Sequence, residues 1–527
     1  MNTRKKLSLL LALLMLCAVF AVACGQTPAE ESAFSESAPE TSTPSQAAQP
    51  VDEYHDADGK YVAKSTGNVY NREITFLACG VNPTYNSEIL YNDYTLDTAS
   101  SEPIPEVINK AQGDRADYVE DKLGVTISEL YVYERSRPNG SMASRIRNDN
   151  LAFSAEYQIV IPCLYDGATL AQEGQFVDLN SMTGLDLNAP WWDQAFNKEN
   201  TIGGQLYFTI GELGTVNKSG TCTLSFNKTL YQKYKLDEKY GGLPYDLVRS
   251  GDWTIDIVLS MVKEVGEDKN SDGQITYEDI YGWGGQLDDM WSLFYGSGSK
   301  IATTDTADGY PELTMFTERS SAIVEQMQSL VQDRAHYVSA NDYFDVVQWP
   351  SVLLVDNFIA GDSLFYNGNM STPIELGEME DAFGMVPVPK GDKMQDGYYS
   401  LVNPWVATCF AVPVSVDESD LPMIADFLNE MGAASANFTG PAYLKQCLEY
   451  MKVRDDDTVE MIEEYILPGR GCDVGMMYQW GGLDQLLQTM AGQPSGSFAS
   501  NYQSKENSAK SAMAETINYF KSLAEES

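Results

Sequence analysis

Short apolar runs alternate with helical patterns along most of this chain, and this alternation limits the possible folds more than any other feature. The runs are bounded by Gly, Pro, Asn or Asp, as strands often are, and lie at 74–79, 125–128, 157–162, 364–366, 383–388 and 410–413. Between them, apolar residues recur at helical spacing, as at Ile323, Met327 and Leu330. Such alternation predicts α/β layers with mainly parallel sheets. The pattern covers about 460 residues, which is too many for one hydrophobic core and suits two domains.

The N-terminus has the pattern of an export signal. Arg4, Lys5 and Lys6 precede an apolar run that ends in small residues before Cys24. The run is shorter than the roughly 20 residues of a membrane-spanning helix, which disfavours the alternative of an uncleaved anchor. Its end, AVACG, resembles the lipobox of bacterial lipoproteins, whose cysteine becomes the lipidated first residue. The sequence thus predicts a signal peptide at 1–23 and a lipid anchor on Cys24 that holds the protein on the extracellular side of the cell membrane.

Residues 24–66 are predicted to form a flexible acidic tether. Much of this segment is rich in Ser, Ala, Pro and Glu and carries few large apolar groups, so it cannot bury enough surface to fold. The whole chain has 76 Asp and Glu against 34 Lys and Arg, a formal net charge of −42. Such a charge repels phosphate backbones and anionic lipid head groups, so we expect no nucleic-acid partner and no membrane contact beyond the anchor.

Histidine and cysteine usage restricts the chemistry of the protein. His55 and His336 are the only histidines, which leaves no basis for a Ser-His-Asp triad or a multi-histidine metal site. Beyond Cys24 the chain contains Cys79, Cys163, Cys222, Cys409, Cys447 and Cys472, and none of them forms a C-x-x-C motif. Their apolar surroundings favour buried thiols, although disulfides outside the cell remain an alternative that the sequence does not assign.

Residues 268–279, DKNSDGQITYED, have the spacing of a cation-binding loop. Asp268, Asn270 and Asp272 occupy positions one, three and five, Gly273 occupies the sharp turn at six, and Asp279 closes the loop at twelve. The predicted Ca²⁺ ligands are Asp268, Asn270, Asp272, the Gln274 carbonyl, Thr276 or a water beside it, and Asp279. Asp279 replaces the usual Glu and reaches less far, which predicts a weaker, structural site between two helices. The alternative is a polar turn that binds no metal.

Several motifs together resemble one protein family. They are Phe226-Asn227-Lys228, the segment 250–254 (SGDWT), the cation loop running into Tyr281-Gly282-Trp283, and the segment 383–390 (FGMVPVPK). In this order they are similar to the extracellular solute-binding proteins of ABC importers, family 1, which bind carbohydrates. The similarity covers nearly all of the folded body.

This resemblance implies a two-lobe periplasmic-binding-protein-like α/β fold of type II, with discontinuous lobes joined by a hinge. Lobe 1 would comprise 67–225 and 391–452, and lobe 2 would comprise 226–390 and 453–527. The hinge crossings would lie at 226–228, at 386–390 and near 450–456. A protein of this kind is not an enzyme. It closes around a carbohydrate and delivers it, as a monomer, to the permease subunits of an ABC transporter.

Sugar capture requires aromatic faces for the C–H groups of the ring and polar partners for its hydroxyls. The chain has 8 Trp and 31 Tyr. In α/β folds, ligands bind at the carboxyl ends of strands, which selects the rings and polar groups that follow the predicted strands. The predicted ligand contacts are Tyr165, Asp166, Trp283, Asp288, Asp289, Trp291, Asn367, Trp405 and Trp480. Trp191 and Trp192 could serve the ligand or support the lobe.

Two other functions fit parts of the sequence. An oligopeptide-binding protein of the same fold has a similar length, but this chain has few basic residues to bind a carboxylate terminus. A surface glycoside hydrolase needs two carboxylates roughly 5 to 9.5 Å apart, and the adjacent Asp288 and Asp289 make a poor pair of this kind. We predict no catalytic residues. The sequence does not distinguish import of the ligand from its presentation to a membrane sensor.

Overall fold

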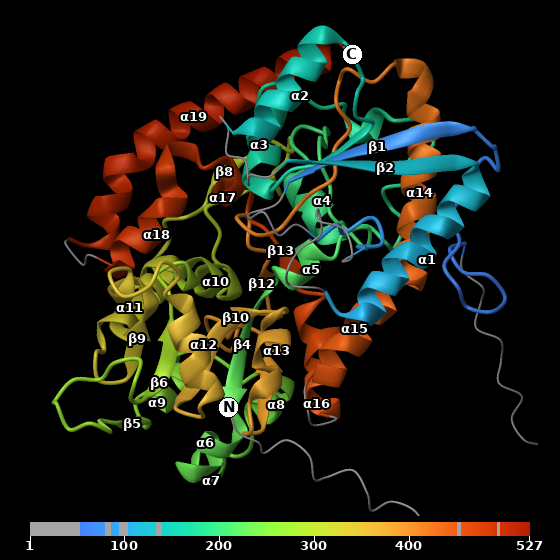
Figure 1. Cartoon of the computed structure of the whole chain (residues 1–527). Helices are drawn as coiled ribbons and strands as arrows, with labels where there is room; N and C mark the ends of the chain where they lie inside the picture. The colour runs from blue at the N-terminus through green and yellow to red at the C-terminus, as the bar shows by residue number, and fades with distance from the viewer. Residues whose placement is uncertain are drawn as a thin grey trace, which may run out of the picture. The chain divides into compact units, whose positions relative to one another are not determined.

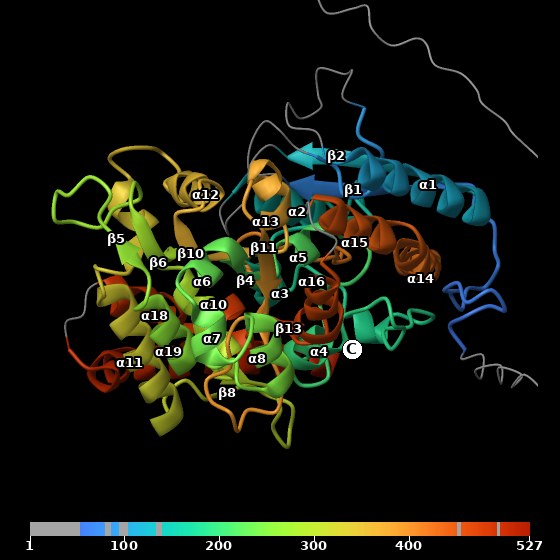
Figure 2. The ribbon, with the colours of Figure 1, turned by 90° about the horizontal axis from the view of Figure 1, so that it is seen from below.

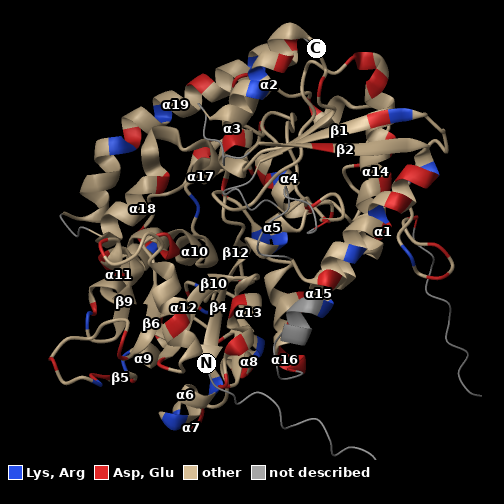
Figure 3. Cartoon of the chain, in the orientation of Figure 1, with Lys and Arg blue, Asp and Glu red and all other residues tan. Residues whose placement is uncertain are grey.

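The computed structural model describes residues 53–79, 86–93, 104–132, 140–450, 455–492 and 496–526. The predicted signal peptide, Cys24 and most of the predicted tether lie outside these ranges. Within them, no helix has both the length and the apolar character needed to cross a membrane. Acidic residues are spread over the helices and loops of the described body (Figure 3).

The first lobe contains a parallel sheet in which β1 (Arg72–Cys79) lies between β2 (Val125–Val132) and β3 (Ile159–Ile161). The apolar residues of β1 are buried on both faces, as expected of a parallel sheet that helices cover. Helices α1 (Glu106–Leu123), α14 (Leu421–Asn437) and α15 (Thr439–Tyr450) lie side by side on this lobe (Figure 2). The return of α14 and α15 from the far end of the chain makes the lobe discontinuous.

The segment before α14 also belongs to the first lobe. Isolated bridges join Val160 to Ala411 and Cys163 to Thr408, so the predicted strand at 410–413 pairs with this sheet without forming a regular strand. Trp191 and Trp192 are buried in the same core, and the Trp191 indole fits against Gly432 of α14. These two rings support the lobe. The remaining helices on this side are α2 (Ser141–Ala152), α3 (Leu164–Gln172), α4 (Gln194–Asn200) and α5 (Val216–Ser219).

The second lobe contains a mixed sheet in the order β11, β4, β10, β6, β5, with β9 also paired to β6. The strands are β4 (Cys222–Asn227), β5 (Gly266–Glu267), β6 (Ile280–Gly285), β9 (Tyr337–Ser339), β10 (Ser363–Asn369) and β11 (Phe383–Val386). β10 runs parallel to β6 and antiparallel to β4. Helices of this lobe are α6 (Lys228–Lys233), α7 (Leu236–Tyr240), α8 (Pro244–Ser250), α9 (Ile255–Val262), α10 (Asp289–Gly296), α11 (Glu318–Gln332), α12 (Ser351–Ile359) and α13 (Thr372–Glu375).

The C-terminal helices pack between and against both lobes (Figure 1). They are α16 (Asp456–Glu460), a π-helix at Met461–Ile466, α17 (Val474–Tyr478), α18 (Leu483–Gly492) and α19 (Phe498–Glu526). α18 packs on α10 and α11, whereas α17 and α19 both contact α3 of the first lobe. The Phe520 ring of α19 stacks on Tyr207 with centroids 5.2 Å apart. The predicted second half of lobe 2, 453–527, therefore contacts both lobes.

The structure corrects the positions of two hinge crossings. All of β4 pairs within the second sheet, so the chain enters lobe 2 before Cys222 and not at 226–228. It leaves through β12 (Ser400–Leu401), which pairs with β13 (Arg470–Gly471), and not at 386–390, because Val386 still pairs with Leu224. The motifs at 226–228 and 383–386 are instead paired neighbours inside one sheet. A small antiparallel pair, β7 (Ala302–Thr303) and β8 (Glu312–Leu313), completes the strands.

The end of the predicted tether is also corrected, because residues 53–66 contact the first lobe. The Tyr54 ring meets Trp191 edge to face at a centroid distance of 5.7 Å. The Asn437 side chain of α14 accepts a hydrogen bond from the Tyr61 backbone N–H and donates one to the Tyr61 carbonyl. Tyr54 and Tyr61 are large aromatic residues at the end of a polar segment, and their burial explains why this part packs on the body.

Candidate functional site

A small pocket lies where β6 and β10 end, and we refer to it as the β6–β10 pocket. Its volume is about 110 Å³. It is lined by Cys222, Gln286, Asp288, Asp289, Trp291, Ser292, Tyr366, Asn367, Gly368, Asn369, Thr372, Glu375, Leu401 and Asn403. The carboxyl ends of parallel strands share one edge of a sheet, so β6 and β10 bring their following residues together. The structure thus places the predicted residues Asp288, Asp289, Trp291 and Asn367 around one hollow.

Asp289 is the most buried carboxylate of the β6–β10 pocket. Its Oδ2 accepts a hydrogen bond of 2.7 Å from the Gln286 backbone N–H, and a side chain at Gly285 would collide with the same oxygen. Burial raises the pKa of Asp289 to about 8, against the lowering effect of the Asn367 side chain and the Gln286 N–H. Asp288 lies at the exposed mouth, where its carboxylate accepts a hydrogen bond of 2.6 Å from the Gln488 side chain.

The structure corrects the predicted role of two tryptophans as ligand contacts. Trp480 is only 2% exposed, stacks on Tyr478 at 5.3 Å, and donates its indole N–H to the Thr516 hydroxyl of α19. Trp283 is buried beside Phe365, with ring centroids 6.0 Å apart. Both rings are packed on their faces by the core, so neither presents a surface on which a sugar could stack here.

The other predicted contacts lie apart from the β6–β10 pocket. Tyr165 and Asp166 are buried in the first turn of α3, and neither lines the pocket. Trp405 is partly exposed on the segment that returns to the first lobe, and its backbone N–H bonds to the Asn403 side chain. Because Asn403 lines the pocket, Trp405 lies near it in sequence without forming its wall.

The predicted cation loop joins the antiparallel strands β5 and β6 of a hairpin. This corrects the expectation that the loop joins two helices. The Asp268 side chain accepts hydrogen bonds from the N–H groups of Ser271 and Gly273, and Asp272 accepts one from Gln274. These bonds hold the turn that the sequence predicts. Asp279 is buried and accepts bonds from backbone N–H groups at both ends of the loop.

This arrangement divides the predicted ligands into two groups. Asp279 accepts hydrogen bonds from the backbone of the loop. Asp268, Asn270 and Asp272 remain on the more exposed side of the loop. Among the described residues, no three His, Cys, Asp or Glu side chains gather closely enough to hold a metal ion. The oxygen donors that fit a hard cation are therefore Asp268, Asn270, Asp272 and the Gln274 carbonyl, without Asp279.

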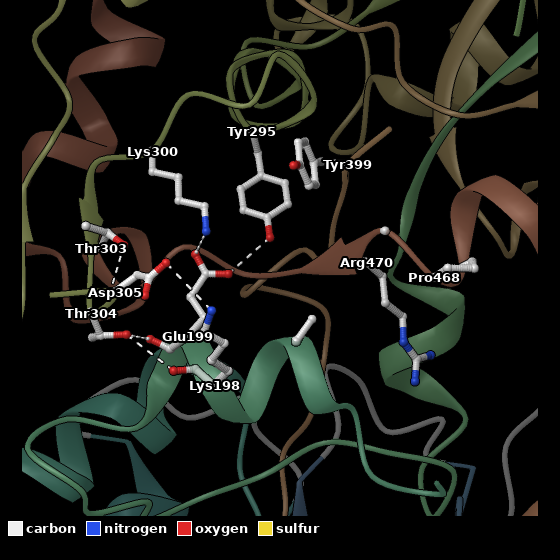
Figure 4. Close-up of a pocket in the computed structure, with 12 residues that line it drawn as sticks. Lys198, Glu199, Tyr295, Lys300, Thr303, Thr304, Asp305, Tyr399, Pro468 and Arg470 are labelled. Carbon is white, nitrogen blue, oxygen red and sulfur yellow. Dashed lines mark hydrogen bonds and ion pairs between the residues drawn. The ribbon is translucent and has the colours of Figure 1, made fainter. Parts of the chain in front are cut away.

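A larger cavity, of about 340 Å³, lies between α4 of the first lobe and α10 with β7 of the second (Figure 4). We refer to it as the α4–α10 cavity. It is lined by Ala195, Lys198, Glu199, Tyr295, Lys300, Thr303, Thr304, Asp305, Tyr399, Pro468, Gly469 and Arg470. None of these residues was among the predicted ligand contacts. They come from separate segments that meet only in the folded chain, and no local pattern in the sequence marks them.

Glu199 occupies the centre of the α4–α10 cavity. Its carboxylate forms an ion pair with the Lys300 ammonium at 2.8 Å and accepts a hydrogen bond from the Tyr295 hydroxyl at 3.2 Å (Figure 4). Burial raises the pKa of Glu199, and the charge of Lys300 opposes that shift. Because Glu199 belongs to α4 while Tyr295 and Lys300 belong to the second lobe, these contacts join the two lobes through polar groups.

Tyr399 and Arg470 form another part of the cavity wall. The Tyr399 ring meets the Tyr295 ring edge to face at a centroid distance of 6.3 Å and is 36% exposed. The Arg470 Nε donates a hydrogen bond of 2.6 Å to Asp193, whose carboxylate also caps the N-terminus of α4. The cavity thus offers aromatic rings, hydroxyls, a carboxylate and ammonium groups on a fixed frame. Such a lining can bind a polar ligand.

The described cysteines support the interpretation of buried thiols. Cys222, Cys409 and Cys472 are buried and form no disulfide within the described part of the chain. Burial raises the pKa of the Cys409 and Cys472 thiols well above the usual value, which keeps them protonated and unreactive. The side chain of Cys447 lies outside the described residues.

No protein-family model matches the sequence, and no curated protein matches it. Among solved structures, an ABC substrate-binding protein from Listeria monocytogenes in complex with cycloalternan aligns with 12% identity and a TM-score of 0.49, covering 86% of this chain and 99% of that chain. The maltose-binding periplasmic protein of the same organism, in complex with maltose, aligns with 14% identity and a TM-score of 0.49 over 85% and 97%. The acarbose-binding GacH receptor of Streptomyces glaucescens aligns with 14% identity and a TM-score of 0.47 over 86% and 98%.

The chain is similar in structure to ABC substrate-binding proteins. Because the TM-scores are below 0.5, nothing is inferred from this similarity about function. The fold is assigned from the strand order of the two sheets. The predicted two-lobe α/β fold is confirmed, because two separate sheets are each covered by helices and are joined by crossing segments.

Proposed function

We propose that this chain is a solute-binding protein that captures a carbohydrate between its two lobes and delivers it to the permease subunits of an ABC importer. The α4–α10 cavity is the observation that carries this proposal. Its walls come from both lobes, it offers the rings of Tyr295 and Tyr399, and it presents charged and hydroxyl groups in a volume of about 340 Å³. Apolar faces combined with convergent polar groups are what a sugar requires.

The proposed mechanism is capture without a chemical step. A sugar in the cavity contacts Glu199 of the first lobe and Tyr295 or Lys300 of the second, so it stabilises the arrangement in which the lobes are together. Its hydroxyls replace part of the ion pair with Lys300 and of the hydrogen bond from Tyr295 that Glu199 now makes. The closed protein then presents one surface to the permease. The residues at the β6–β10 pocket, Asp288, Asp289, Trp291 and Asn367, are proposed to contact a further part of the ligand.

A panel of mono- and oligosaccharides is expected to contain a ligand that raises the melting temperature and reduces the radius of gyration in solution scattering. At a hundredfold excess over the dissociation constant, binding adds about 2.7 kcal/mol to the free energy of unfolding. Replacing Tyr399 by Ala should remove most of this gain, because the ring is a partly exposed wall of the cavity. The molecular mass obtained from solution scattering should be that of a monomer.

The matched control is Trp349→Ala, which removes a ring that is 68% exposed and does not line the cavity. This variant should keep the full ligand response. A panel without any stabilising sugar would refute carbohydrate capture. Stabilisation by a dipeptide mixture alone would instead favour an oligopeptide-binding protein, and release of reducing sugar from an oligosaccharide would favour a glycoside hydrolase.

We also propose that the loop at 268–279 binds a structural Ca²⁺ through Asp268, Asn270, Asp272 and the Gln274 carbonyl. The support is the set of oxygens on one exposed turn together with the sharp bend at Gly273, whose φ is 85°. Removing Ca²⁺ with a chelator is expected to lower the melting temperature by about 2–5 °C, because the folded loop then loses a bound ligand.

The Asp272→Ala variant should melt at the lower temperature and no longer respond to the chelator. Asp345→Ala removes another exposed carboxylate from the same lobe and should keep the response. An equal melting temperature of the wild type with Ca²⁺ and with the chelator would show that the loop is a polar turn that binds no metal.

The location of the protein in the cell is also part of the proposal. We infer that the export signal is removed before Cys24, that Cys24 carries the lipid, and that the body faces the outside of the cell membrane. The support is the order of charged, apolar and small residues at the N-terminus.

A further inference from the structure

The β6–β10 pocket carries charge of one sign. Asp288, Asp289 and Glu375 line it, and no Lys, Arg or His is among its lining residues. The α4–α10 cavity differs in this respect, since Lys198, Lys300 and Arg470 are part of its wall. A group that enters the β6–β10 pocket therefore meets carboxylates without a cation beside them, which disfavours anionic ligands.

Asn367 provides a second, independent observation. Its side chain is 6% exposed, lines the pocket, and uses its Nδ2 to donate to the Ser292 hydroxyl at 3.2 Å. Its Oδ1 has no hydrogen-bond donor among the described residues. Buried acceptors are almost always paired, so this oxygen indicates that a donor is supplied from outside the chain.

Asp289 supplies a buried carboxyl group next to this acceptor. It is 7% exposed, and no cationic side chain pairs with it in the described part of the chain. The titratable groups that face it are Asp288, Cys222, Tyr337, Tyr366 and Glu375, none of which carries a positive charge. Its raised pKa has the same physical cause, which is burial without a neutralising partner.

We propose that the β6–β10 pocket binds a protonated amine, which donates hydrogen bonds to Asn367 and Asp289. The captured carbohydrate is therefore an amino sugar. This inference rests on the proposed capture of a carbohydrate. An ammonium group has three N–H donors and no acceptor, so it satisfies the Asn367 carbonyl and the carboxylates at once. The two hollows are close along the chain, since Leu401 of β12 lines the pocket and Tyr399, just before β12, lines the α4–α10 cavity.

Four related sugars test the inference by calorimetry: glucosamine and its β-linked oligomers, the N-acetylated forms, the corresponding glucose forms, and glucuronic acid. The amine is expected to bind at least about tenfold tighter than the N-acetylated and glucose forms, which corresponds to one additional charge-assisted hydrogen bond. Glucuronic acid should bind most weakly. Binding of the amine should also release protons from the protein, because an adjacent cation lowers the pKa of Asp289.

The Asp289→Asn variant keeps the shape of the side chain and should lose the preference for the amine over the glucose form. Asp345→Asn, which removes an exposed charge elsewhere, should keep the preference. Equal affinity of the amine, N-acetylated and glucose forms would overturn this inference and leave carbohydrate capture standing. Failure of every sugar to bind would overturn the proposed function itself. Binding of a dipeptide that depends on Asp289, without sugar binding, would assign the pocket to a peptide amine and overturn both.

Discussion

Replacing Arg115 by Met is expected to lower the free energy of unfolding by about 3–5 kcal/mol. Arg115 is fully buried in α1. Its guanidinium donates to the carbonyls of Glu88, Ile89 and Leu213 at 2.8 Å each and to the Ser435 hydroxyl at 3.1 Å. One side chain thus joins α1, α14 and two loop segments. Met fills a similar volume but leaves these acceptors without donors in an apolar environment.

The neighbouring carboxylate increases this effect. Glu88 is buried and accepts hydrogen bonds from the N–H groups of Thr215 and Val216 and from the Thr408 hydroxyl. Burial raises the pKa of Glu88, and these bonds and the charge of Arg115 oppose that shift. Burial lowers the pKa of Arg115 to about 10, against the opposing effect of Glu88, so the guanidinium stays charged at neutral pH. The substitution therefore also removes the positive charge that acts on the buried Glu88 carboxyl group.

Denaturant unfolding followed by tryptophan fluorescence measures the loss. The matched control is Arg145→Met, because Arg145 lies at the surface of α2 and its only hydrogen bond in the described structure is a 3.4 Å contact to Tyr157. This control should change the free energy of unfolding by less than about 0.5 kcal/mol. If both variants unfolded at the same denaturant concentration as the wild type, the network around Arg115 would not contribute to stability.

The sequence predicts β1 and β10 because their apolar runs are buried, whereas the inner strands β4 and β6 of the second sheet were not among the predicted runs. The predicted runs at 74–79 and 364–366 lie inside β1 and β10. The run at 410–413 is less regular in the structure, since it makes only isolated bridges, with Val160, Phe176 and Thr209. The two-residue strand β5 before the cation loop is too short to give an apolar pattern, which is why the loop was expected between helices.

Part of the candidate site follows from the same reasoning. Asp288, Asp289 and Asn367 come together because β6 and β10 are parallel neighbours and end at one edge. The orientation of a ring cannot be derived in this way. Trp480 lies just before the helix that begins at Leu483, as predicted, but its indole donates a hydrogen bond to Thr516 of α19, a contact between residues far apart in the sequence.

The α4–α10 cavity could not be predicted from the sequence, for a physical reason. Its charged residues, such as Lys198, Glu199 and Lys300, have the appearance of solvated surface groups in the sequence. They become a cavity wall only because Asp193 and Arg470 pair across two distant segments and fix α4 near β13. A site that depends on contacts between lobes requires the folded chain to be recognised.

Replacing Cys24 by Ser is expected to move the protein from the membrane fraction of cells into the surrounding medium and to abolish import of its sugar. Ser lacks the thiol that would carry the lipid, and buried acyl chains contribute about 0.8 kcal/mol per methylene to membrane binding. The acidic body, with its net charge of −42, has no affinity of its own for anionic lipids. Fractionation of cells, together with incorporation of a labelled fatty acid, measures the change.

Cys17→Ser is the matched control, because it replaces a cysteine of the same signal that lies before the predicted cleavage point. It should remain labelled and bound to the membrane. A Cys24→Ser protein that stays with the membrane would show that the apolar run is an uncleaved anchor. Loss of the label without loss of import would show that delivery to the permease needs no lipid, whereas an unchanged import rate in cells lacking the whole protein would favour a role in presenting the ligand to a sensor.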